Sequence, residues 1–239
     1  MEKLYFTSDY LEGAHPKIMQ RLVETNMEKT SGYSTDAYCD SARKKICKAC
    51  NAPDAEVHFL VGGTQTNAII IKYLLAPYQG VISAQTGHIA CHEAGAIEHG
   101  GHKVLPVPEY NGKLRAQDVE TLVKTFNSDD NREHMVMPGM VYISQPTESG
   151  TLYSLAELEQ ISKVCNAHDL YLYVDGARLA YALACPENDV CTDCRKAESG
   201  GGDCEKYQQR HELYAEAAGD TEGKKPEPGA GQSGHCGKS

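Results

Sequence analysis

The chain has 239 residues, with 23 Lys and Arg against 33 Asp and Glu, which gives a formal net charge of −10. This length suits one large domain, and an acidic chain without a basic block argues against nucleic acid as the main partner. No apolar run reaches the roughly 18 residues of a membrane span, and the first ten residues lack the apolar core of a signal peptide. Ten Cys without a secretory start favour reduced thiols, so we expect a soluble cytoplasmic protein with no membrane partner.

The first predicted strand and helix meet at a pair of glycines. Residues 56–61 form a β-branched and aromatic run that stops at Gly62 and Gly63. A helix is predicted over residues 64–75, with Thr64 as its N-cap. Its expected apolar stripe consists of Ile69, Ile70, Tyr73 and Leu74.

Strands and helices continue to alternate along the chain. The expected elements are strands at 81–84 and 103–107, a helix at 116–126, a strand at 140–144, a helix at 154–167 and a strand at 170–174. Ser154 and Glu157 fit a capping box, which fixes the start of the last helix. This alternation predicts an α/β fold of three layers, with a mostly parallel sheet flanked by helices on both faces.

The composition changes near residue 190. In the 49 residues from 191 to 239, Leu213 is the single member of the Ile, Leu, Val, Met and Phe set, and nine Gly and two Pro accompany it. Such a segment cannot bury enough apolar surface to offset the entropy lost on ordering. We therefore expect a domain over residues 1–190 and a disordered tail of low hydrophobicity over 191–239.

Polar side chains follow each predicted strand. In parallel sheets, ligands bind outside the carboxyl ends of the strands, so this concentration favours an active site there. The residues in question are Thr64 to Asn67 after the first strand, His88, His92 and Glu93 after the second, Ser144 to Glu148 after the fourth, and Asp175 and Arg178 after the last.

Each of these residues has a chemical use and an ordinary structural alternative. Gly63 and Thr64 at a helix N-terminus can seat a phosphate, although glycine pairs end many strands. Asp175 can hold a protonated ring nitrogen and Arg178 a phenolate or carboxylate, or they can be an N-cap and a surface residue. His88 can stack on a planar cofactor or be a core or surface histidine. A metal site would use His88, His92, Glu93, His99 and His102, but these lack the HExxH spacing, and we expect no metal.

Taken together, these motifs resemble the threonine aldolase and β-eliminating lyase family of pyridoxal-phosphate enzymes of fold type I. The match covers about residues 1–190 in the family's order, and its six motifs are Phe6 to Tyr10, Gly63 to Asn67, Thr86 to His88, His92 to Ala96, Thr147-Glu148 and Asp175 to Arg178. The resemblance implies the large domain of the aminotransferase-like superfamily and pyridoxal 5′-phosphate as cofactor.

The resemblance also implies roles for individual residues. The cofactor-binding residues would be Gly63 and Thr64 at the phosphate, His88 stacked on the ring, Asp175 at the pyridinium nitrogen and Arg178 beside the ring hydroxyl. Ser8 would contact the carboxylate of the amino-acid substrate, and Glu93 would position a catalytic water or proton. His88 would also take part in proton transfer.

The reaction implied is retro-aldol cleavage of threonine, or a related β-hydroxy-α-amino acid, to glycine and an aldehyde. A β-elimination on another amino acid is the alternative, and its products would be pyruvate and ammonia. Family members are oligomers with sites at subunit interfaces, so the resemblance implies a homo-oligomer when the chain is complete.

The resemblance stops near residue 190. The family has a lysine that forms the Schiff base about 30 residues after the aspartate, in a Gly-Gly-Thr-Lys type segment. Lys206 lies 31 residues after Asp175, but its neighbours do not match that segment, so the lysine is left unassigned with Lys206 as a candidate. We expect a chain that is truncated or frame-shifted at its C-terminus.

Two further readings concern this end of the chain. The first is a non-catalytic fragment that associates with a full-length homologue. The second is a zinc-binding module in the tail, although its Cys and His spacings fit no known finger pattern. Its ligands would be Cys191, Cys194, Cys204, His211, His235 and Cys236.

Overall fold

The computed structural model describes residue 11 and residues 13–185. Ser8, Lys206 and the segment 191–239 therefore lie outside the described residues. The chain divides into two compact units, of which the first contains residues 1–57 and the second contains residues 58–185 of the described part. All the described candidate site residues belong to the second unit.

The first unit contains two helices that the sequence did not predict. α1 spans Pro16–Thr25, and its N-cap His15 accepts a hydrogen bond from the Lys17 N–H. α2 spans Ala37–Ala49, and the carboxylate of its N-cap Asp36 accepts from two backbone N–H groups of the first turn. Neither helix contains a buried residue, so these helices are held by their caps and by local side-chain contacts.

The second unit is built on a four-stranded parallel sheet, as the alternating pattern predicts. Its strands are β1 (Gln79–Ala84), β2 (Val104–Val107), β3 (Met137–Ser144) and β4 (Tyr171–Asp175), in the order β2-β1-β3-β4. The chain runs outward from β1 to β2 and then returns to place β3 on the other side of β1. This reversal makes the carboxyl ends of β1 and β3 the switch point where ligands bind in such sheets.

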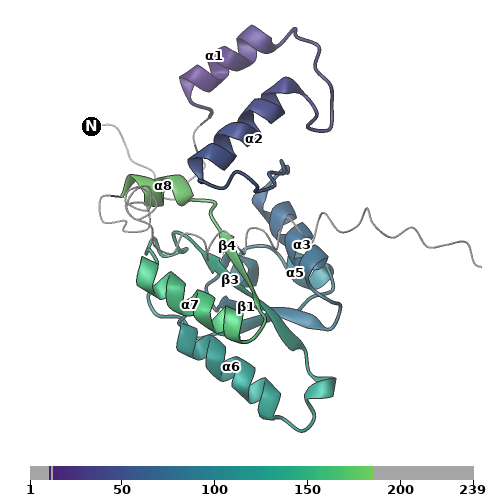
Figure 1. The fold of residues 1–239 in the computed structure, drawn as a ribbon, viewed down its shortest axis with the longest axis vertical. Helices are drawn as coiled ribbons and strands as arrows, with labels where there is room; N and C mark the ends of the chain where they lie inside the picture. Colours follow the sequence, from purple (N-terminus) through teal and green to yellow (C-terminus); the bar gives the residue numbers. More distant parts are fainter. Residues whose placement is uncertain (1–10, 12, 186–239) are drawn as a thin grey trace, which may run out of the picture. The chain divides into compact units, whose positions relative to one another are not determined.

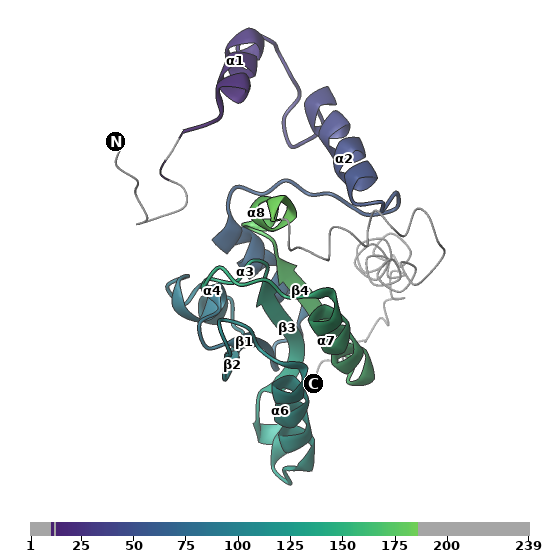
Figure 2. The same cartoon turned by 90° about the vertical axis from the view of Figure 1, so that its left-hand side faces the viewer.

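Helices cover both faces of the sheet, as Figures 1 and 2 show. One face carries α3 (Gly63–Leu74), α4 (His88–Cys91) and α5 (Ala96–His99), and the other carries α6 (Ala116–Ser128) and α7 (Leu155–Ala167). Two short elements complete the unit, the 3-10 turn η1 (Arg132–His134) and α8 (Leu179–Ala184). Within the described residues, no helix has the length and apolar character needed to cross a membrane.

The alternation of side chains along β3 creates two cores. Val141 and Ile143 pack with α6 and α7, whereas Met140 and Tyr142 pack with α3, α4 and α5. All four side chains are at most 2% exposed. At about 1.5–3 kcal/mol for each large buried apolar side chain, the two cores hold the carboxyl end of β3 firmly in place.

The predicted strand at residues 56–61 is wrong. No strand forms there, and the apolar side chains Phe59, Leu60 and Val61 are exposed, the last to 94%. A run of strand-forming residues becomes a strand only where a neighbouring strand bonds to its backbone. In the described part of the chain, the sheet contains β1, β2, β3 and β4 and does not include this run.

Two predicted details of α3 differ from the structure. Its N-cap is Gly62 rather than Thr64, and the Thr66 side chain and backbone both bond to the Gly62 carbonyl. The predicted apolar stripe is correct at Ile70 and Leu74, which pack against the core, and wrong at Ile69 and Tyr73, which are 43% and 60% exposed. The buried positions of α3 are instead Asn67 and Ile71, so a polar side chain faces inward.

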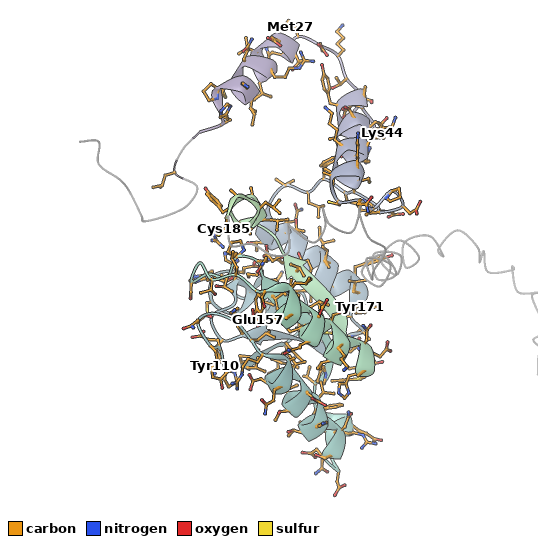
Figure 3. All side chains as sticks on the ribbon, turned by 60° about the vertical axis from the view of Figure 1, so that its left-hand side comes forward. Met27, Lys44, Tyr110, Glu157, Tyr171 and Cys185 are labelled. Carbon is orange, nitrogen blue, oxygen red and sulfur yellow. The ribbon has the colours of Figure 1, made fainter. Side chains whose placement is uncertain are left out.

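The other predicted elements are confirmed, and no end differs from its predicted position by more than three residues. α7 carries the predicted capping box, in which Ser154 accepts from the Glu157 N–H while the Glu157 carboxylate accepts from the Ser154 N–H. Lys113 adds a salt bridge to Glu157, at 2.7 Å from Nζ to Oε1. Figure 3 labels Glu157 on α7.

Candidate active site

A pocket lies where the carboxyl ends of β1, β3 and β4 meet the start of α3. The pocket is partly open to solvent. The lining residues are Gly63, Asn67, His88, Glu93, Ser144, Pro146, Glu148, Asp175, Ala177 and Arg178. The peptide bond before Pro146 is cis.

Asp175, the last residue of β4, presents a carboxylate with three donors. Its Oδ2 accepts from the Tyr142 hydroxyl at 2.6 Å and from Asn67 Nδ2 at 3.2 Å. Its Oδ1 accepts from the Ala177 N–H at 3.0 Å. Donors of this kind stabilise the ionised form of a carboxylate, so the arrangement can hold a cationic group of a ligand.

The Tyr142 hydroxyl is a permanent donor in this arrangement. The side chain is 1% exposed. Burial, and then the negative charge of Asp175 and the hydrogen bond to it, raise the pKa of Tyr142 well above its ordinary value of 10.0. The hydroxyl therefore keeps its proton throughout the neutral range and donates it to Asp175.

Glu93 fixes the ring of His88. Glu93 Oε1 lies 2.8 Å from His88 Nδ1 and accepts from Asn67 Nδ2 at 2.6 Å. Because a carboxylate only accepts, the shared proton belongs on Nδ1, and Nε2 is the nitrogen that can take up another. Glu93 is one of the residues that line the pocket, and its side chain is fully buried. Its Oε2 has no hydrogen-bond partner among the described residues.

The backbone of His88 is held from the opposite side. Its N–H donates to Glu148 Oε1 at 2.9 Å, and the same oxygen accepts from the Ser144 hydroxyl at 2.6 Å. The preceding residue, Gly87, lies against the end of β1, where a Cβ would collide with the Ser83 hydroxyl. The His88 ring is one-third exposed, so one face remains accessible to a planar ligand.

The N-terminus of α3 provides the site's backbone donors. The first N–H groups of a helix have no partner within the helix and favour anions. Gly63 lines the pocket, and a Cβ added there would meet no atom within 4 Å, so a ligand can approach its backbone. Thr64 is exposed and does not line the pocket.

The structure thus brings together most of the residues singled out from the sequence. Gly63, His88, Glu93, Asp175 and Arg178 line one pocket. Ser8 and Lys206 lie outside the described residues, and within residues 13–185 no lysine lines the pocket.

The histidines of the possible metal site do not converge. The His88 and His92 rings are 5.6 Å apart, but His99 is exposed and His102 bonds to the Gln79 carbonyl. Across the described part of the chain, no three His, Cys, Asp or Glu side chains are placed to hold a metal ion.

Sequence reasoning missed two residues of the pocket's polar framework. Asn67 was part of a motif without a role, and Tyr142 was expected only as a strand residue. The signal for Asn67 is its spacing: it precedes the buried Ile71 by one helical turn, which puts a polar side chain on the core-facing side of α3. No sequence signal separates the Tyr142 hydroxyl from an ordinary core tyrosine.

Comparison with known proteins gives the family. Residues 6–200 match the family model of the beta-eliminating lyases. The chain belongs to the beta-eliminating lyase family. It is 31% identical over 181 residues to the low specificity L-threonine aldolase of Pseudomonas aeruginosa, covering 75% of this chain and 51% of the relative. It is 28% identical over 151 residues to the low-specificity L-threonine aldolase of Candida albicans, covering 62% and 39%.

A solved structure of Leishmania major threonine aldolase shares the fold. Its TM-score is 0.72 at 49% sequence identity, over 76% of this chain and 52% of that one. The chain therefore spans about half the length of the P. aeruginosa and L. major proteins. Over that span, the comparisons confirm the fold and the family that the motifs predict.

Members of this family are enzymes that use pyridoxal 5′-phosphate, and the pocket residues fit this cofactor. Asp175, with three donors, suits a protonated ring nitrogen. The accessible ring of His88 suits stacking, and the open backbone of Gly63 at a helix N-terminus suits a phosphate. Arg178 adds a guanidinium to the same wall.

Proposed function

We propose that this chain forms the cofactor-binding part of a lyase of the threonine aldolase type. The substrate is threonine or a related β-hydroxy-α-amino acid, and the products are glycine and an aldehyde. The observation that carries this proposal is that one pocket contains both Asp175, whose carboxylate accepts three hydrogen bonds, and the His88 ring, which Glu93 holds in place. The threonine aldolase relatives support the choice of reaction.

The residues bind the cofactor as follows. Asp175 holds the ring nitrogen in its protonated form, because its carboxylate offers a fixed negative charge to that atom. Gly63 and Thr64 would bind the phosphate, the His88 ring would stack on the cofactor ring, and Arg178 would lie beside the ring hydroxyl. When bound, the protonated cofactor ring supplies a sink for the electron pair of the broken carbon–carbon bond.

His88 and Glu93 handle the proton. With Nδ1 committed to Glu93, Nε2 of His88 accepts the proton from the substrate β-hydroxyl, and the negative charge of Glu93 stabilises the imidazolium that forms. Glu93 lines the pocket, and its remaining oxygen, which is buried and has no partner among the described residues, would accept a hydrogen bond from a catalytic water or from the substrate. Ser8 contacts the substrate carboxylate.

The test is an assay of the full chain with pyridoxal 5′-phosphate and L-threonine. The expected products are glycine and acetaldehyde, and formation of ammonia with a keto acid would instead assign a β-elimination. Asp175→Asn removes the charge at the ring nitrogen and is expected to abolish turnover. Asp118→Asn is the matched control, since Asp118 pairs with Arg115 on α6, outside the pocket.

A second measurement concerns the covalent attachment of the cofactor. Borohydride reduction followed by peptide mapping identifies the lysine that carries it, and Lys206 is the position at the family's separation from Asp175. Turnover without acetaldehyde, or absence of both turnover and cofactor binding, would refute the proposal. A chain that binds the cofactor without turnover and associates with a full-length homologue would be the non-catalytic alternative.

We also propose that the chain forms a homo-oligomer. α8 supports this proposal, because Leu179, Tyr181 and Leu183 are 43%, 66% and 49% exposed within a six-residue helix. Apolar side chains gathered in this way favour burial against a partner surface. Light scattering after size exclusion tests the proposal, and a monomer at all concentrations would refute it.

A further inference from the structure

A network of hydrogen bonds crosses the floor of the pocket. It runs from the His88 ring to Glu93, Asn67, Asp175 and Tyr142. Asn67 occupies the central position in this network, because its Nδ2 donates both to Glu93 Oε1 at 2.6 Å and to Asp175 Oδ2 at 3.2 Å.

The amide of Asn67 has one permitted orientation. The side chain is 2% exposed, and its Oδ1 accepts from the Tyr173 hydroxyl at 2.6 Å. The reversed amide would aim its oxygen at two carboxylates and lose both bonds. One buried amide group therefore uses each of its two N–H bonds on a different carboxylate of the pocket.

This placement separates two like charges. The Glu93 and Asp175 oxygens contact the same nitrogen, so they are at most about 6 Å apart, a range in which two carboxylates repel strongly. With a donor between them, both carboxylates can stay ionised. Without it, the pair lowers its energy by sharing a proton, and Asp175 then offers the ring nitrogen a neutral acid.

We propose that Asn67 is a positioning residue that keeps Asp175 ionised toward the cofactor ring and couples it to the Glu93–His88 pair. This inference rests on the proposed function. A purely packing role does not account for the residue, because Ile71, one turn later on the same face of α3, shows that an apolar side chain suits this core.

The experiment uses pyridoxamine 5′-phosphate, which has no aldehyde and binds without a lysine. The full chain is titrated at a pH at which the ring of the free ligand is mostly neutral, and both the affinity and the absorption band of the protonated ring are recorded. The unmodified chain should bind with the protonated band. Asn67→Leu keeps the size and removes the donor, so affinity should fall about tenfold and the band should move to that of the neutral ring.

Two variants complete the test. Tyr173→Phe leaves Asn67 in place but removes the hydroxyl that orients it, so a smaller change in the same direction is expected even if Asn67→Leu fails to fold. Tyr153→Phe is the control, since it removes a buried hydroxyl bonded to the Leu114 N–H outside the pocket and should leave the band unchanged.

Two outcomes would overturn the inference in different ways. If Asn67→Leu or Tyr173→Phe folds and binds with unaltered affinity and the protonated band, the amide serves packing alone while the proposed function stands. If the unmodified chain does not bind pyridoxamine 5′-phosphate, the proposed function fails, and the inference fails with it.

Discussion

Two buried tyrosines should control how this protein unfolds in alkaline solution. Tyr142 and Tyr153 are 1% and 2% exposed, and burial raises the pKa of each well above its ordinary value of 10.0. Above that value, the tyrosines of the unfolded chain lose their protons while the folded chain keeps them. The stability they contribute is therefore complete below pH 10 and is lost as the pH rises above it.

The magnitude for Tyr142→Phe follows from the contacts of the hydroxyl. At neutral pH the variant loses a 2.6 Å hydrogen bond to Asp175, at a cost of about 2 kcal/mol. Above pH 10 the unmodified chain loses about 1.4 kcal/mol per pH unit through this tyrosine, and the variant does not. The two stabilities should therefore converge about 1.5 pH units above the ordinary value.

Urea unfolding at a series of pH values from about 9 to about 11.5 measures this convergence. Other titrating groups are common to both proteins, so they cancel in the difference. Tyr78→Phe is the control, because Tyr78 is 65% exposed and its removal should leave the pH dependence unchanged. If the difference in free energy of unfolding between the unmodified chain and Tyr142→Phe stays constant over this pH range, the burial assigned to Tyr142 is refuted.

Three smaller predictions test local features of the second unit. Ser154→Ala removes the capping box of α7 and should cost about 1 kcal/mol in urea unfolding. Gly112→Ala should destabilise the fold more than Gly150→Ala in the same measurement, because both have φ +79° but only Gly112 would bring a Cβ within 2.8 Å of the Thr147 hydroxyl. Burial opposes ionisation of Glu157, but Lys113 and Ser154 outweigh it and lower its pKa; acid titration of Glu157→Gln should therefore show less loss of stability below about pH 4.5 than the unmodified chain.

The sequence predicts the elements whose signals are local. The capping box of α7 depends on residues within one turn, and its start is correct to the residue. β1 and β3 are also predictable, because both contain nearly continuous runs of buried apolar residues, a pattern typical of strands covered on both faces. The residues at and after the carboxyl ends of β1, β3 and β4 then give most of the pocket, since parallel strands bring those ends to one edge.

What the sequence does not give depends on contacts distant in the chain. Residues 56–61 have the composition of a strand, but pairing with another strand decides whether one forms. Asn67 is a residue type typical of a helix surface, but it faces inward because it bonds to the carboxylates of Glu93 and Asp175, which lie 26 and 108 residues away in the chain. A polar residue at a core-facing position costs stability unless its partners are in place, and only the tertiary structure shows those partners.

The order of the sheet explains why the pocket forms where it does. Because β3 returns beside β1, the loop that carries His88 and the loop that carries Glu148 leave the sheet next to each other. Asp175 then follows on β4, one strand further along, and Asn67 on α3 joins it to the Glu93–His88 pair. The carboxylates of Glu93, Glu148 and Asp175 each accept a hydrogen bond from a residue of another element. The contacts that hold the Asp175 carboxylate therefore depend on the assembly of the whole unit rather than on any single motif, and this dependence is what Asn67→Leu and Tyr173→Phe probe.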